Sequence, residues 1–156
     1  MNLTETATLA ADNITLAHRQ FTVASNLSVA LPSGKVTAIV GPNGCGKSTL
    51  LNGLARIHAP DTGTVLLDGK DIHALPSKDV ARKLALLPQD NTAPEGLTVA
   101  DLVRFGRQPH QGWIKQWSRK DQQAFDRAVA AADVIELQDR ALDTLSGGQR
   151  QRAWIA

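Results

Sequence analysis

A glycine-rich stretch between an apolar run and a leucine-rich segment constrains this chain more than any other feature. The run at 36–40 is apolar without alternation, which predicts a strand covered on both faces. Residues 50–57 carry apolar side chains at helical spacing, which predicts a helix. Between them, residues 41–49 read GPNGCGKST and fit the pattern of a phosphate-binding loop. The chain is therefore expected to contain a strand, a phosphate loop and a helix in that order.

The residue types in this loop match what binding of a nucleotide's phosphates requires. Glycines permit positive φ, so several backbone N–H groups can converge on the β- and γ-phosphates, and the helix dipole adds a favourable field. Lys47 adds a mobile positive charge, the Ser48 hydroxyl is the expected Mg²⁺ ligand, and Thr49 supports the next turn. A plain tight turn is the alternative, and the flanking strand and helix argue against it. The expected phosphate-binding residues are Gly41, Pro42, Asn43, Gly44, Cys45, Gly46, Lys47, Ser48 and Thr49.

A second glycine motif, Leu145-Ser146-Gly147-Gly148-Gln149, stands ahead of another expected helix. Ser146 is well placed as an N-cap, and the two glycines permit close approach of another group to the backbone. On physical grounds this motif is a second anion site.

The rest of the chain divides into a strand-rich beginning and a helical second half. Alternating apolar residues at 13–31 predict half-buried antiparallel strands, and residues 64–72 predict a hairpin that turns at Asp68-Gly69. A further strand is expected at 84–87. Helices are expected at 77–83, from the capping-box pattern at Thr98 onward, and over 118–137. With 42% hydrophobic and 21% charged residues among 156, the composition suits one continuous folded domain.

Charge and cysteine content exclude several classes of function. The net charge is +2, too small to imply a nucleic-acid surface by itself. A single cysteine, Cys45, excludes an internal disulfide and a cysteine-cluster metal site, and it suits a reducing compartment. We expect no export signal, because residues 1–6 lack a basic n-region and an apolar h-region, and no membrane span, because no apolar run approaches about 20 residues.

Taken together, GPNGCGKST at 41–49, LPQ at 87–89 and LSGGQRQR at 145–152 resemble the ATP-binding subunit of an ABC transporter. The resemblance implies a P-loop α/β fold with an N-terminal antiparallel β-subdomain and a helical subdomain, incomplete at its C-terminus. The expected parts of this partial nucleotide-binding domain (1–156) are the start of the β-subdomain at 1–35, the P-loop core at 36–89, the helical subdomain at 90–145 and the start of the signature helix at 146–156.

The resemblance also assigns roles to residues outside the phosphate loop. Ser146, Gly147, Gly148 and Gln149 would bind, in trans, the γ-phosphate of ATP held by the opposite subunit's loop, which implies a dimer. Gln89 matches the glutamine whose side chain approaches Mg²⁺ and the attacking water. The expected catalytic residues are thus Gln89 and Lys47, and the expected Mg²⁺ contacts are Ser48 and Gln89.

The position that stacks on adenine in similar proteins is usually aromatic, and here it is His18. Imidazole offers less stacking area than Tyr or Trp, so Phe21 is an alternative, and an exposed histidine at a strand end is another. His58, His73 and His110 share no metal-ligand spacing and are expected to be solvated.

A narrower resemblance concerns residues 101–110 and 149–156, which are similar to ATPases of ferric-siderophore (enterobactin and citrate) and vitamin B12 importers. It implies ATP and Mg²⁺ as cofactors, a homodimer, membrane permease subunits and, indirectly, a substrate-binding protein, but no nucleic acid. It also implies a peripheral position on the cytoplasmic face of the inner membrane. Trp113 and Trp117 would lie near the permease groove, or would be buried helix anchors.

Two alternative functions remain open, and the sequence differs from the family pattern in one important respect. The alternatives are a soluble ABC ATPase of repair or translation and a non-catalytic nucleotide-binding fragment. The difference is that the family's aspartate–glutamate pair and switch histidine lie beyond the signature, whereas this sequence ends at Ala156. We therefore expect a truncated chain with an unpaired parallel strand edge, weak nucleotide binding and little hydrolysis by itself.

Overall fold

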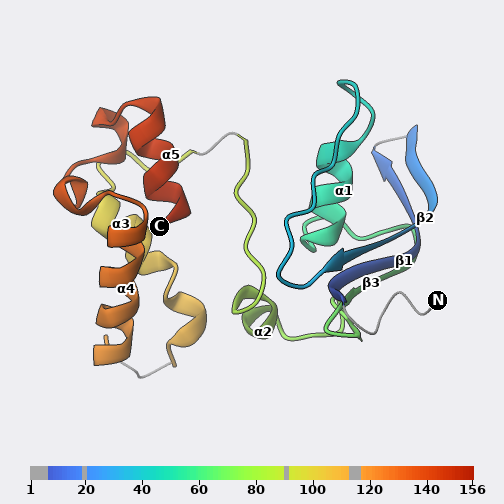
Figure 1. Cartoon of the computed structure of the whole chain (residues 1–156), viewed down its shortest axis with the longest axis horizontal. Helices are drawn as coiled ribbons and strands as arrows, with labels where there is room; N and C mark the ends of the chain where they lie inside the picture. Colours follow the sequence, from blue (N-terminus) through green and yellow to red (C-terminus); the bar gives the residue numbers. More distant parts are fainter. Residues whose placement is uncertain (1–6, 19–20, 90–91, 113–116) are drawn as a thin grey trace. The chain divides into compact units, whose positions relative to one another are not determined.

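A computed structural model describes residues 7–18, 21–89, 92–112 and 117–156 (Figure 1). The chain forms two compact units, one up to Ala85 and the other from Leu86 onward. The first unit contains the sheet and two helices, and the second unit contains only helical elements and loops among its described residues.

The first unit is built on a four-stranded sheet with the order β2-β1-β3-β4, in which every neighbouring pair is antiparallel. Its strands are β1 (Ala7–His18), β2 (Phe21–Pro32), β3 (Thr62–Leu67) and β4 (Lys70–Asp71). The register places Leu16 opposite Ala24 in β2, and Leu9 opposite Leu67 in β3. The predicted antiparallel beginning of the chain is confirmed.

The turn between β3 and β4 follows from its two residues. Asp68 and Gly69 have φ of 49° and 73°, the positive values that a two-residue type I′ hairpin turn requires. The hairpin predicted at 64–72 is therefore confirmed.

Two helices cover this sheet and close its core. Helix α1 (Lys47–Leu54) packs against β1, and a Cβ added to Gly53 would stand only 3.1 Å from the Leu16 side chain. Helix α2 (Ser77–Ala81) contributes Val80. The buried core comprises Ala11, Ile14, Leu16, Leu54, Val65, Leu67, Ile72 and Val80. The helix predicted after the phosphate loop is thus present, and it packs against β1.

The second unit consists of short helices with strong start signals. They are α3 (Val99–Phe105), η1 (Gln108–His110), α4 (Arg119–Ala131), η2 (Ile135–Leu137), η3 (Leu142–Thr144) and α5 (Gly147–Ile155). Three of these helices begin with a capping box at Thr98, Ser118 or Ser146. The side chain of each cap accepts from the backbone N–H three residues later, and the cap's own N–H donates to that residue's side chain. Val99, Val103, Phe125, Val129, Val134 and Leu142 are among its buried core residues.

Three sequence predictions are wrong in this structure. Neither 36–40 nor 84–87 forms a strand, and the side chains of Val36 and Val40 are 100% and 87% exposed. A strand needs a ladder partner, and no part of the described chain pairs with either run. The helix predicted over 118–137 ends at Ala131, because Asp133 adopts φ of 53° and so terminates it in the left-handed region. Ile135, which the predicted helix would have included, is 51% exposed.

No helix in the described ranges is both long enough and apolar enough to cross a bilayer.

Candidate nucleotide-binding site

The phosphate loop leads directly into the first turn of α1, and two of its glycines are required by its backbone. Gly44 and Gly46 have φ of 81° and 95°, values that other L-residues adopt only under strain. Gly46 is the N-cap of α1 and provides no side chain to cap the helix. The first turn of α1 therefore presents its backbone N–H groups without a competing side-chain acceptor at the N-cap, as an anion site needs.

Gly46 is also required by its neighbour on β2. A Cβ at this position would overlap the Cγ1 atom of Val23, whereas a Cβ on Gly44 would meet nothing within 4 Å. Val23 was predicted only as a strand residue, and sequence analysis missed its contact with the loop. No local signal could have found it, because the two residues are brought together by the packing of β2 against the loop.

Lys47 places its charge inside the loop rather than away from it. Its Nζ donates to the carbonyl oxygens of Gly41 at 2.9 Å and Pro42 at 2.7 Å, and lies 3.8 Å from the Cys45 Sγ. An ammonium group has three donors, so the loop atoms engage all of them. The positive charge is thereby held beside the backbone that is expected to bind phosphate.

The donor set fits Mg²⁺ only as part of a site that the nucleotide completes. Ser48, the second residue of α1, is exposed, and its hydroxyl oxygen is a hard ligand of the kind Mg²⁺ prefers. In the described ranges, no three His, Cys, Asp or Glu residues gather into a possible metal site. Ser48 supplies one protein oxygen in this unit, and the other predicted contact, Gln89, belongs to the second unit. So few protein ligands suit an ion that otherwise takes phosphate oxygens and water.

The adenine-stacking prediction remains open between its two candidates. His18 is the last residue of β1, and its backbone pairs with Phe21, the first residue of β2. The Phe21 ring is 77% exposed and so is available to another group. His58 is exposed as expected, and its Nε2 lies 2.9 Å from the carbonyl oxygen of Ala17. The aromatic candidate therefore stands at the hairpin end beside His18.

The second glycine motif forms the start of α5, as the N-cap prediction required. Ser146 Oγ accepts from the Gln149 backbone N–H at 3.3 Å, and Ser146 N–H donates to Gln149 Oε1 at 3.1 Å. Gly147 and Gly148 are exposed, and a Cβ on either would meet nothing within 4 Å. The Ser146 hydroxyl keeps its own hydrogen to donate, and the first turn of this nine-residue helix is open to an approaching anion.

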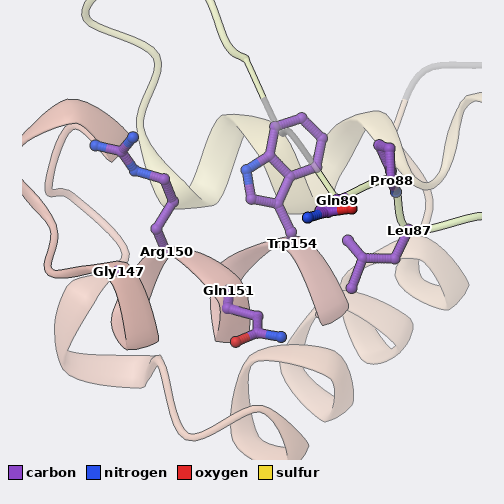
Figure 2. Close-up of a pocket in the computed structure, with 7 residues that line it drawn as sticks. All are labelled: Leu87, Pro88, Gln89, Gly147, Arg150, Gln151 and Trp154. Carbon is purple, nitrogen blue, oxygen red and sulfur yellow. The ribbon is translucent and has the colours of Figure 1, made fainter. Parts of the chain in front are cut away.

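Gln89 lies beside this helix in a groove of about 440 Å³ (Figure 2). The groove is lined by Leu87, Pro88, Gln89, Gly147, Arg150, Gln151 and Trp154. Figure 2 shows the side chains of Arg150 and Trp154 rising from the same side of α5, with Gln151 turned away from them. The Trp154 Nε1 atom is buried, and within the described structure it has no hydrogen-bond partner. The structure thus brings Gln89 next to the signature helix, which sequence reasoning did not predict.

The predicted site residues therefore fall into two groups in different units. The phosphate loop and His18 belong to the first unit, whereas Gln89 and 146–149 belong to the second. Trp113 lies outside the described residues. Trp117, 37% exposed, meets the Phe125 ring edge-on, and its Nε1 donates to Gln122 Oε1 at 2.7 Å, which favours a role as an anchor on α4.

Comparison with known proteins gives a consistent result. Residues 24–156 match the family described as ABC transporter. The ferric enterobactin transport ATP-binding protein FepC of Escherichia coli (strain K12) is 50% identical over 150 residues, covering 96% of this chain and 55% of FepC. The petrobactin import ATP-binding protein FpuD of Bacillus anthracis is 49% identical over 143 residues, covering 92% of this chain and 52% of FpuD. The chain spans about half the length of the curated relatives it matches.

Solved structures show the same fold. A bacterial Atm1-family ABC exporter with ATP bound has a TM-score of 0.74 at 27% identity, covering 97% of this chain and 27% of that one. The ATP-binding cassette MJ1267 of an ABC transporter has a TM-score of 0.72 at 27% identity, covering 96% of this chain and 63% of that one.

Proposed function

The chain belongs to the ABC transporter family, and from this premise we propose that it binds Mg-ATP as part of the ATPase subunit of an importer for ferric siderophores. The observation that carries the proposal is the phosphate loop itself. Its backbone requires glycine at Gly44 and Gly46, and its lysine ammonium is held inside the loop. A plain tight turn needs neither the close approach of Val23 to Gly46 nor a lysine whose ammonium bonds to the loop carbonyls.

The direction of transport and its cargo rest on the relatives rather than on the fold. The same fold occurs in an exporter, so architecture alone does not distinguish import from export. The relatives at 49–50% identity are named for import of petrobactin and transport of ferric enterobactin. We therefore place this chain with siderophore import, with two copies acting against membrane permease subunits at the cytoplasmic face of the inner membrane.

Each ATP would be contacted by the phosphate loop of one copy and by the signature motif of the other. In one copy the phosphate loop would hold the β- and γ-phosphates, with the Lys47 charge beside them, and the Ser48 hydroxyl would be a ligand of Mg²⁺. From the other copy, Ser146 and the first turn of α5 donate to the γ-phosphate. The Gln89 side chain would approach Mg²⁺ and the attacking water. Mg²⁺, when bound, neutralises charge that develops on the phosphate oxygens.

Loss of the loop's charge tests nucleotide binding. Lys47→Ala should weaken ATP binding about ten- to more than a hundredfold, because charge-assisted contacts contribute about 1.5–3 kcal/mol each. Lys35→Ala is the matched control, since Lys35 is exposed and lies before the loop in the same unit. Titration with a fluorescent ATP analogue measures both. Equal affinity of a folded Lys47→Ala protein and the control would contradict the proposal.

The importer proposal requires a test in cells. The full protein should co-purify with two membrane permeases, and its deletion should abolish uptake of iron from siderophores. Normal uptake in the deletion strain, with no related gene compensating, would instead favour a soluble ABC ATPase.

A further inference from the structure

The loop that leads into Ser146 is fastened by two arginine side chains. Arg150 Nε donates to the carbonyl oxygen of Leu142 at 3.0 Å, and its Nη2 donates to that of Asp143 at 3.3 Å. Arg140 Nη2 donates to the carbonyl oxygen of Thr144 at 3.3 Å. All three carbonyls of η3 are therefore bonded to guanidinium groups immediately before the signature motif begins.

The other side of this loop is attached to the core of the unit. Leu142 is buried, with 3% of its surface exposed, and its N–H donates to the carbonyl oxygen of Leu97 at 2.9 Å. Leu145 is also buried, with 7% exposed. The path of the chain from Leu142 to Leu145 is thus fixed by packing on one side and by Arg150 on the other.

Arg150 is joined to Ser146 as well as to the loop. Its backbone N–H donates to the Ser146 carbonyl oxygen at 2.8 Å, the first hydrogen bond of α5. Arg150 is consequently bonded to η3 through its side chain and to Ser146 through its backbone N–H. Arginine suits this position because two separate nitrogens of its planar guanidinium donate to the two carbonyls, whereas all the donors of a lysine share one nitrogen.

We propose that Arg150 is a positioning residue that sets the direction of the Ser146 hydroxyl and the first turn of α5 toward the γ-phosphate held by the partner subunit. The proposal rests on the proposed function, because it assigns a role within the ATP site shared by two copies. Arg150 does not touch the nucleotide. It acts by holding the backbone that carries Ser146.

The expected consequence is a loss of turnover without a loss of ATP binding in the altered subunit. Displacement of a positioning group by about 1 Å costs on the order of 10²-fold in rate, so we expect Arg150→Gln to lower hydrolysis about 10- to 100-fold. ATP affinity of the monomer should stay within about twofold, because the phosphate loop of the same chain is unchanged. Arg150→Lys should recover part of the rate, since it keeps the charge but has one donor nitrogen in place of the Nε and Nη2 atoms that reach the two carbonyls.

Mixed dimers of the full protein separate positioning in trans from general damage to one subunit. A heterodimer of Arg150→Gln and Lys47→Ala subunits keeps one site with an intact loop and an intact signature. A heterodimer of wild type with a subunit that carries both substitutions keeps no intact site. Two affinity tags isolate each heterodimer, and phosphate release measures its turnover.

The first arrangement should hydrolyse ATP at least about tenfold faster than the second if Arg150 acts on the partner's nucleotide. Arg127→Gln, an exposed arginine on α4, is the charge-matched control and should leave turnover unchanged. Turnover of the second arrangement equal to or above that of the first would overturn the proposal, because damage confined to the altered subunit would leave the wild-type subunit of the second arrangement intact.

Failure of the proposed function gives a different result. Wild-type protein that neither dimerises with ATP nor hydrolyses it would overturn the shared site itself and this proposal with it. Activity that is lost in Ser146→Arg but kept in Arg150→Gln would overturn the role of Arg150 alone.

Discussion

Alanine at Gly46 should damage nucleotide binding more than alanine at Gly44, and the structure explains the difference. Both residues have positive φ, so either substitution forces an L-residue into the left-handed region. That conformation costs about 1–2 kcal/mol per residue. Only at Gly46 does the new Cβ also overlap a neighbour, the Cγ1 atom of Val23.

The two costs can be added to give expected affinities. Strain alone at Gly44→Ala, about 1–2 kcal/mol, corresponds to about 5- to 30-fold weaker binding of ATP, because phosphate needs the loop in this conformation. Overpacking against Val23 adds about 1–3 kcal/mol at Gly46→Ala. The total of about 2–5 kcal/mol corresponds to a loss from about thirtyfold to a few thousandfold.

A double-mutant cycle isolates the contact with Val23. Val23→Ala removes Cγ1 and leaves the Val23 Cβ 3.5 Å from the new methyl group, which is an ordinary contact. Val23→Ala combined with Gly46→Ala should therefore regain the overpacking part, about 1–3 kcal/mol, and behave like Gly44→Ala. Titration with a fluorescent ATP analogue gives the affinities, and thermal unfolding by circular dichroism verifies that each variant is folded. Equal losses at Gly44 and Gly46, or no recovery with Val23→Ala, would refute the reasoning.

Three further predictions concern other parts of the molecule. Alkylation of the exposed Cys45 thiol should be slowed by ATP, because the thiol lies in the phosphate loop. Mass spectrometry of the labelled protein measures the alkylation rate, and an unchanged rate at saturating ATP would contradict the prediction. Ser146→Arg should leave ATP binding intact and abolish ATP-dependent dimerisation in the full protein, and sedimentation that shows equal dimer formation would contradict the trans role. The Ser118 hydroxyl first, then its backbone N–H and Arg107, hold the pKa of Asp121 below its ordinary value against the opposing effect of burial. The stability that this carboxylate contributes is thus fully present above about pH 4 and is lost as pH falls through its lowered pKa. Asp121→Asn should therefore weaken the acid dependence of the circular dichroism signal. Identical acid profiles of the two proteins would contradict this.

Features encoded by neighbouring residues could be predicted from the sequence. The caps at Thr98 and Ser146 each depend on a partner three residues later, and the turn at Asp68-Gly69 depends on two residues that tolerate positive φ. The phosphate loop was predictable for the same reason, because its glycines and Lys47 lie within nine consecutive positions.

Features that need a distant partner were missed or predicted wrongly. The apolar runs at 36–40 and 84–87 have strand-like composition, but composition does not supply the ladder partner that a strand requires. The contact between Val23 and Gly46 joins two elements whose packing no local pattern records. Likewise, the bonds from Arg150 depend on where the carbonyls of Leu142 and Asp143 point, which side-chain identity does not reveal.

The two expected anion sites, the phosphate loop and the signature motif, differ in their N-caps and in the charge that faces an anion. At the phosphate loop, a glycine N-cap leaves the first turn of α1 free and Lys47 adds a full positive charge. At the signature, Ser146 is a neutral cap, and the guanidinium of Arg150 is turned to the carbonyls behind it. A helix N-terminus alone contributes only about 0.3–1 kcal/mol to binding an exposed anion. We therefore expect the first site to hold a nucleotide by itself, and the second to gain useful affinity only for a phosphate that another loop already holds in place. That asymmetry would suit an ATP bound between two copies of the chain.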